Sequence, residues 1–185
     1  MRRVVITHAR RSPIGKFLGA FSELSAVDLG VAVVKDLLRA SRVDLGAIDQ
    51  VIMGNARQAG GGPNPARQIA IKSGCAPTTV AMTINMACAS GLKSIGLAAD
   101  AIAAGDADVI VAGGVESMTR LPYLLPRARD GYRMGHASLV DAMYQDGFHC
   151  PLADQLMGAT AENLADRYAI SRREQDEYAV MSQSR

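Results

Sequence analysis

The hydrophobic pattern alternates between short apolar runs and longer segments with helical spacing. Runs rich in β-branched residues predict strands over 3–9, 50–53, 79–84 and 108–112. The last of these runs is continuous, which is typical of a strand buried on both faces. Apolar residues recur every three or four positions after Ser25, within 65–73 and after Leu92, which predicts helices. This alternation predicts βαβ units and an α/β fold.

The ends of the predicted helices carry recognisable capping residues. Ser25 is placed to cap a helix that runs to about Ala40, and Gly105 is placed to end the helix that begins near Leu92. One face of the first helix collects apolar side chains, which are Val27, Val31, Val34 and Leu38. We expect this face to pack against the sheet.

The composition changes near Met118, where prolines, glycines and arginines replace the alternating elements up to Arg133. We therefore expect a core domain over 1–117 and a smaller, mostly helical lid or loop region over 118–185. The lid would contain 139–143 and two helices from about Thr160, the second begun by a capping box at Ser171 and Glu174. That last helix reaches Arg185 without a closing residue, so the chain is expected to be truncated there.

Cys88 stands between a predicted strand and the first turn of a predicted helix. A thiol at a helix N-terminus meets unpaired N–H groups and the positive end of the helix dipole, which favour a thiolate. The same N–H groups could hold the oxygen of a thioester as it becomes an oxyanion. An isolated cysteine among apolar residues is more often a small buried hydrophobe. Ser90 and Gly91, however, would let a ligand approach closely, so Cys88 is the predicted nucleophile and these two are predicted substrate-binding residues.

The segment from Asn85 to Leu92 resembles the nucleophile motif of the thiolase family, whose acetyl-CoA acetyltransferases carry the acyl group on this cysteine. Four further segments resemble the family's signatures in its order: 11–19, 54–68, 113–118 and 157–163. Together they run through nearly the whole chain and are specific as a set. The resemblance implies the N-terminal half of a thiolase, with a mixed sheet covered by helices, and assigns Met157 to the wall of the acyl pocket.

What the resemblance implies for chemistry is an acyl transfer from coenzyme A thioesters. Cys88 would form an acyl-cysteine, and its reaction with acetyl-CoA would give a 3-ketoacyl-CoA, with acetoacetyl-CoA as the expected product; the reverse reaction would be thiolysis. The histidine and second cysteine of the family's C-terminal half have no matching motif, because the chain contains neither a Gly-His-Pro segment nor a cysteine followed by glycines. The chain alone is therefore expected to be incomplete. A ketoacyl-synthase-like condensing enzyme and a non-catalytic CoA-binding or dimerisation module stay open as alternatives.

Composition excludes other classes of function. A formal charge of +2 and 4% aromatic residues argue against a nucleic-acid partner. From the sequence we expect no apolar run long enough for a membrane span and no secretion signal, and therefore a cytoplasmic protein. The three histidines and three cysteines lack metal-ligand spacing, so neither a metal nor a permanently bound cofactor is expected. The resemblance implies a homo-oligomer, a dimer or tetramer, or a complementary C-terminal half as partner.

Overall fold

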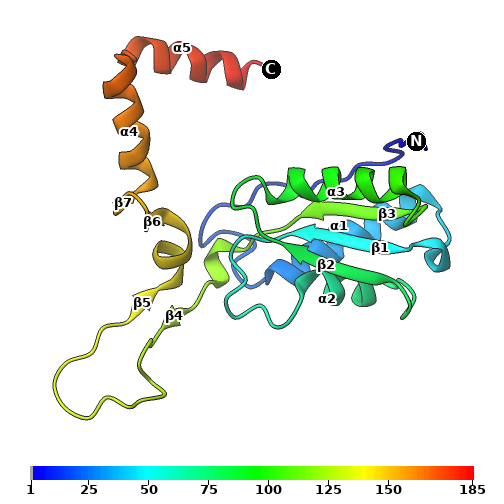
Figure 1. Cartoon of the computed structure of the whole chain (residues 1–185), viewed down its shortest axis with the longest axis horizontal. Helices are drawn as coiled ribbons and strands as arrows, with labels where there is room; N and C mark the ends of the chain where they lie inside the picture. The colour runs from blue at the N-terminus through cyan, green and yellow to red at the C-terminus, as the bar shows by residue number, and fades with distance from the viewer. Residues whose placement is uncertain (1) are drawn as a thin grey trace. The chain divides into compact units, whose positions relative to one another are not determined.

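A computed structural model describes residues 2–185 of the 185-residue chain. The backbone divides into two compact units, Met1–Met143 and Tyr144–Arg185. The first unit holds a three-stranded sheet with helices on both of its faces (Figure 1). Residues 118–143 belong to this unit, whereas the composition change placed them in the lid. The domain boundary after Ser117 stays a prediction about the organisation of the whole protein.

The sheet consists of β1 (Gln50–Gly54), β2 (Val80–Ile84) and β3 (Ile110–Gly114), with β1 in the centre. All three strands are parallel, where the resemblance implied a mixed sheet, and the register sets Gly54 beside Ile84 and Gly114. Parallel neighbours need crossover connections, which α2 (Pro65–Ser73) and α3 (Ser90–Ala104) supply. The predicted α/β class and βαβ units are confirmed.

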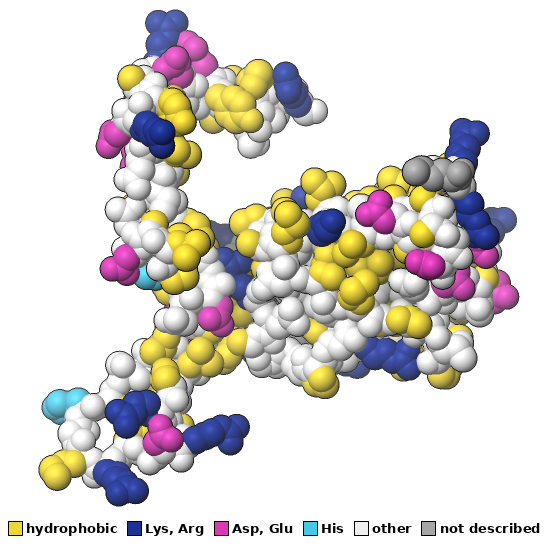
Figure 2. Space-filling view, in the orientation of Figure 1, with side chains coloured by type: hydrophobic (Ala, Val, Ile, Leu, Met, Phe, Trp, Pro, Cys, Tyr) yellow, Lys and Arg dark blue, Asp and Glu magenta, His cyan; other side chains and the backbone are white. Residues whose placement is uncertain are grey.

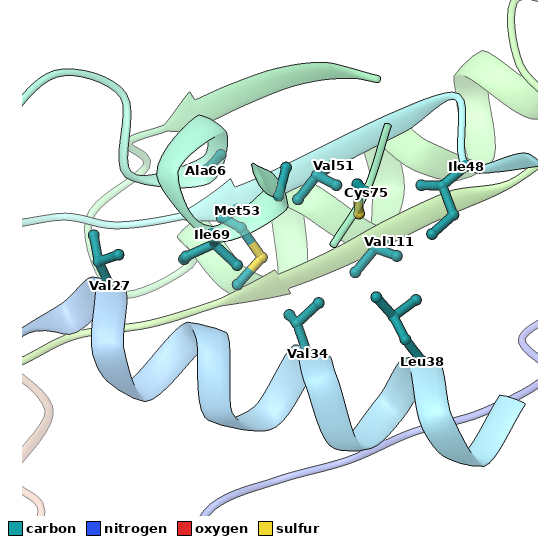
Figure 3. Close-up of a cluster of buried hydrophobic side chains, with 11 residues drawn as sticks. Val27, Val34, Leu38, Ile48, Val51, Met53, Ala66, Ile69, Cys75 and Val111 are labelled. Carbon is teal, nitrogen blue, oxygen red and sulfur yellow. The ribbon is translucent and has the colours of Figure 1, made fainter. Parts of the chain in front are cut away.

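Helix α1 (Ala26–Ser41) and α2 lie on one face of the sheet, and α3 lies on the other (Figure 1). Ser25 and Asp28 form a capping box at the start of α1, so the predicted cap is confirmed. Figure 3 shows the buried side chains of α1 directed toward β1 and β3; these are Val27, Val34 and Leu38. Each such side chain contributes about 1.5–3 kcal/mol on full burial, which anchors α1 to the sheet.

The predicted strand over 3–9 is wrong, because this segment has no strand partner among the described residues. Val5 and Ile6 are 61% and 77% exposed. β-Branched residues favour a strand chiefly through packing on a sheet surface, and that surface is missing here. Side-chain ion pairs hold the segment instead, from Arg2 to Asp108 at 2.5 Å and from Arg10 to Asp36 at 2.8 Å.

Strand β3 begins two residues later than the sequence predicts. The Asp49 carboxylate accepts hydrogen bonds from the backbone N–H groups of Asp108 at 2.7 Å and Val109 at 3.0 Å. These side-chain bonds accompany a backbone bond at the strand entrance, in which the Asp49 N–H donates to the Val109 carbonyl oxygen at 3.0 Å. Only Val111 of β3 is buried, so burial on both faces, which the apolar run suggested, does not hold for the described chain.

Short elements complete the first unit. The 3-10 turns are η1 (Leu45–Ala47) and η2 (Met118–Arg120), and β4 (Tyr123–Leu124) pairs antiparallel with β5 (Val140–Asp141). The arginine-rich stretch forms the long connection between these two strands, drawn in yellow-green in Figure 1. The pairing places 140–141 in the first compact unit, and the assignment of 139–143 to a lid of the whole protein stays a prediction.

The second unit contains a π-helical turn η3 (Tyr144–Phe148) and a small hairpin of β6 (His149–Cys150) and β7 (Gln155–Leu156). Helices α4 (Met157–Tyr168) and α5 (Arg172–Gln183) follow. The predicted capping box at Ser171 and Glu174 begins α5. This part of the chain is mostly helical, as predicted, and α4 begins three residues before Thr160.

Candidate active site

Cys88 lies in the loop that joins the end of β2 to the start of α3. Ile84 is the last residue of β2 and Ser90 is the first of α3, so the predicted strand–cysteine–helix order is confirmed. The loop is at the carboxyl edge of the parallel sheet, which is where open α/β sheets bind their ligands. Cys88 is exposed, whereas Cys75 is buried and Cys150 is half-buried. The structure therefore does not support the alternative that Cys88 is a small buried hydrophobe.

The backbone just before Cys88 has a conformation that a non-glycine residue rarely adopts. Ala87 has a φ of 48°, in the left-handed region. Its N–H donates to Asn85 Oδ1 at 2.9 Å, and its carbonyl oxygen accepts from the Ser90 hydroxyl at 2.6 Å. These two bonds hold Ala87 in a conformation that costs on the order of 1 kcal/mol. The loop is thus built to present Cys88 at one fixed place.

Ser90 contributes to this loop through both hydrogen-bonding capacities of its hydroxyl. Besides donating to Ala87, its Oγ accepts from the Met86 N–H at 2.8 Å, and the side chain is only 4% exposed. The sequence predicted substrate contact for Ser90, which stays a prediction. The observed bonds reveal a second role, because they hold the loop of residues 85–89, called the Cys88 loop below.

Backbone donors near Cys88 are available to a ligand. Within residues 2–185, the N–H groups of Gly91 and Leu92 donate to no acceptor, whereas the backbone of Cys88 forms an isolated β-bridge with Met86. The first N–H groups of any α-helix lack partners within the helix, and here no side chain replaces them, since the cap residue Ala89 makes no side-chain bond. Such donors attract the negative charge that develops on a carbonyl oxygen under attack.

Three glycines let α3 start directly against the carboxyl ends of β1 and β3. A Cβ on Gly54 would lie 2.4 Å from the carbonyl carbon of Ser90, and one on Gly114 would lie 2.9 Å from Gly91 Cα. A Cβ on Gly91 itself would face Gly114 at 3.6 Å. Gly91 therefore meets strand β3, and its predicted contact with substrate stays a prediction. Small residues at these positions bring the helix terminus, and Cys88 with it, to the edge of the sheet.

A carboxylate ties the loop after β1 to the loop after β3. Glu116 accepts from Asn55 Nδ2 at 2.6 Å and from the backbone N–H groups of Ala56 at 3.0 Å and Arg57 at 3.2 Å. Asn55 is 2% exposed, and its own N–H extends the ladder to Ile84 at 3.0 Å. Glu116 and Asn55 thus link the carboxyl ends of all three strands.

Comparison with known proteins places this geometry in a family. The description of the matching family is "Thiolase, N-terminal domain", and the match extends over residues 4–185. The chain belongs to the thiolase family. The resemblance seen in the sequence is confirmed, and the match decides for a thiolase and against the ketoacyl-synthase alternative. The strand β2, the Cys88 loop and helix α3 are therefore part of a thiolase N-terminal domain.

Relatives within the thiolase family are similar along the whole chain. The chain is 50% identical over all 185 residues to an acetyl-CoA acetyltransferase of Pseudomonas aeruginosa and 49% identical over 184 residues to one of Escherichia coli. It is 47% identical over 185 residues to a probable acetyl-CoA acyltransferase of Staphylococcus aureus. These matches cover 100%, 99% and 100% of the chain and 47% of each relative. The chain spans about half the length of the curated relatives it matches.

Met157, the remaining predicted site residue, is the first residue of α4 and is 48% exposed. It belongs to the second compact unit, and Cys88 belongs to the first. The thiolase role given to Met157, a wall of the acyl pocket, stays a prediction. The half-exposed thioether is available for an apolar contact.

Several residues that shape this thiolase site were not predicted as functional. Asn85, Asn55 and Glu116 follow the ends of β2, β1 and β3, and Gly54 and Gly114 share one register position. A signal for them does exist in the sequence, since each is a polar or glycine residue directly after an apolar run. The carboxyl ends of parallel strands meet at one edge, so such residues are brought together.

Glu116 gives the thiolase domain a testable dependence on pH. Burial raises the pKa of its carboxyl above the ordinary value of 4.5, although the N–H groups of Ala56 and Arg57 act in the opposite direction. The folded chain then holds this proton more tightly than the unfolded chain. The stability contributed by Glu116 is therefore full below pH 4.5 and is lost as the pH rises through the folded pKa.

As the pH rises from 4.5 through the folded pKa of Glu116, the free energy of unfolding of the wild type should fall relative to that of Glu116→Gln. Urea denaturation of both proteins at a series of pH values measures this, and a difference that grows in favour of the wild type with rising pH would contradict it.

Two further features of the described chain concern membranes and metals. The segment Ala87–Ala104, with a mean hydropathy of 1.2, is long and apolar enough to cross a membrane by length and composition, so the expectation of no such run was wrong. Length and composition alone are weak evidence for a membrane span. Helix α3 includes Lys93 and Asp100, and it packs on the sheet through Ser90, Ser94 and Ala98.

Among residues 2–185, no group of three or more His, Cys, Asp or Glu side chains could hold a metal ion.

Proposed function

We propose that this chain supplies the nucleophile of a thiolase-type acyltransferase, which converts an acyl-CoA and acetyl-CoA into a 3-ketoacyl-CoA and free CoA, and catalyses the reverse thiolysis. The observation that carries the proposal is the exposed Cys88 thiol on a constrained loop at the start of α3. The acetyltransferase names of relatives near 50% identity support the same activity.

In the first step, the Cys88 thiolate attacks the carbonyl carbon of the thioester. A bond forms between Sγ and this carbon, and the carbonyl oxygen becomes an oxyanion. In this proposal the N–H of Cys88 donates to that oxygen, and a typical oxyanion donor contributes about 2.7–4 kcal/mol. Collapse of the intermediate expels the CoA thiolate and leaves an acyl-Cys88. Covalent catalysis of this kind divides one difficult step into two easier ones.

In the second step, the α-carbon of acetyl-CoA attacks the acyl-Cys88 and regenerates the thiolate. This requires a base within hydrogen-bond distance of the α-proton. The side chains that hold the Cys88 loop, Asn85 and Ser90, are neutral and are not suited to take this proton. We propose that the base and the partner of the first thiolate come from a C-terminal thiolase half, as the resemblance implies. Coenzyme A thioesters are the proposed substrates, with acetoacetyl-CoA as the product.

The proposed partner is a second copy of the chain or a complementary thiolase half. Figure 2 shows hydrophobic side chains exposed on the face that carries α3 and β2. Those with large exposed fractions are Leu92 at 75%, Val80 at 61% and Met82 at 41%. Large apolar side chains that are exposed on one face are typical of an interaction site. A cytoplasmic location is proposed from the bacterial acetyltransferase relatives.

The proposed function predicts that the 185-residue chain alone is acetylated on Cys88 by acetyl-CoA. It should neither form acetoacetyl-CoA by condensation nor cleave it by thiolysis. A positioned base contributes about 10²–10⁴-fold, and correct orientation of two substrates contributes more, so the rate without them should be near background. Cleavage of acetoacetyl-CoA is measured for the chain with and without an added C-terminal thiolase half, and Cys88→Ser provides the control. Cleavage by the chain alone at the rate of a complete enzyme would show that the base lies within these residues.

A further inference from the structure

The Cys88 loop is connected to the end of β3 by a chain of hydrogen bonds that passes through the loop after β1. The Glu116 carboxylate accepts from the Ala56 N–H at 3.0 Å, and the Ala56 carbonyl oxygen accepts from Asn85 Nδ2 at 3.0 Å. Asn85 Oδ1 then accepts from the Ala87 N–H at 2.9 Å. This series of hydrogen bonds ends at Ala87, one residue before Cys88.

Each link in this chain constrains the next one. Three donors fix the Glu116 carboxylate, and one of them, Asn55, is almost fully buried. The Arg57 N–H, which donates to Glu116 at 3.2 Å, lies in the same peptide plane as the Ala56 carbonyl, so this bond gives the Ala56 carbonyl oxygen a defined direction. The Asn85 amide donates to that oxygen and must orient its own oxygen toward Ala87. Ala87 has a φ of 48°, so its conformation depends on such outside support.

We propose that Glu116 is a positioning residue, which acts through Ala56 and Asn85 to hold Ala87 in its left-handed conformation and so sets the place of the Cys88 thiol and N–H. Glu116 itself is not a nucleophile or base in this account. It determines whether Cys88 meets the thioester carbonyl at the attacking distance, and a displacement of about 1 Å can lower a rate by about 10²-fold. The part of the inference that concerns acyl transfer rests on the proposed function.

The first test needs no acyl donor. Amide hydrogen exchange, followed by NMR, reports whether the Ala87 N–H remains bonded. In Glu116→Gln an amide group replaces one carboxylate oxygen and cannot accept from the Ala56 and Arg57 N–H groups as the carboxylate does. Exchange at Ala87 should rise about tenfold, while the amides of β1 keep their protection. The matched control is Glu23→Gln, which alters an exposed carboxylate before α1 and should leave Ala87 unchanged. If Glu116→Gln does not fold, Glu116→Asp, with its shorter side chain, takes its place.

The second test asks whether Glu116 and Asn85 act through one path. The rate of Cys88 acetylation by acetyl-CoA is measured for Glu116→Gln, Asn85→Ala and the double variant. Each single variant should lower the rate constant by about tenfold with little change in the acetyl-CoA concentration at half-saturation, and the double variant should fall no further. Effects that multiply to about 100-fold would show independent roles and overturn the relay.

The outcomes separate the two proposals. Unchanged exchange at Ala87 in Glu116→Gln overturns the positioning role, whatever the chain does with acetyl-CoA. An absence of acetylation in the wild type overturns the proposed function, while the exchange measurement still decides the relay. Raised exchange at Ala87 together with non-additive losses of acetylation supports both.

Discussion

Cys88→Ala is expected to abolish acyl transfer while leaving the fold intact. The substitution removes the only group in this loop that can form the acyl-enzyme, and loss of a nucleophile lowers turnover by on the order of 10⁶-fold in an enzyme with a complete site. Because Cys88 is exposed, the free energy of unfolding should change by no more than about 0.5 kcal/mol. Release of CoA from acetyl-CoA in a single turnover measures the first effect, and urea denaturation measures the second. Wild-type CoA release by the variant would remove Cys88 from the mechanism.

Gly54→Ala is expected to damage both stability and activity. Its new Cβ would lie 2.4 Å from the Ser90 carbonyl carbon and 2.6 Å from the Gly91 nitrogen, and these are backbone atoms that can move only if α3 moves. Overpacking of this kind costs about 3 kcal/mol, and the displaced helix would carry the Cys88 loop with it. The free energy of unfolding, measured by denaturant titration, and the rate of Cys88 acetylation should both decline.

Gly96→Ala is the matched control for that substitution. Gly96 lies in the same helix with nothing within 4 Å of its Cβ position, so alanine should stabilise α3 by about 1 kcal/mol through helix propensity. Acetylation should be unaffected. Equal stability of the two variants would show that the close contact of α3 with β1 does not limit the residue at position 54.

The elements that could be predicted from sequence are those whose signals are local. Ser25 and Asp28 cap α1 through neighbouring residues, Gly105 ends α3 in a left-handed conformation, and the apolar periodicity of α1 defines its buried face. Cys88 was found for the same reason, since a strand, a small-residue turn and a helix adjoin it in the chain. The family resemblance added the acyl-transfer chemistry, which local pattern alone does not give.

The predictions that failed depend on distant partners. Residues 3–9 have strand propensity without a neighbouring strand, and β3 starts late because Asp49, 59 positions before Asp108, binds its first N–H groups. The bond between Glu116 and Ala56 likewise joins residues 60 positions apart. Such contacts follow from the order of strands in the sheet, which single-sequence periodicity does not encode. Residues at the carboxyl edge were therefore seen as motifs, but not as one hydrogen-bonded group.

The central claim, that Cys88 is the nucleophile, is tested most directly by locating the acyl group. The intact chain is incubated with acetyl-CoA, digested, and analysed by mass spectrometry of its three cysteine-containing peptides. Burial raises the pKa of the Cys75 thiol, and Cys150 is half-buried in the second unit, so neither should compete. The account predicts one acetyl group, on the peptide that contains Cys88. Acetylation of Cys75 or Cys150 with Cys88 unmodified would contradict it.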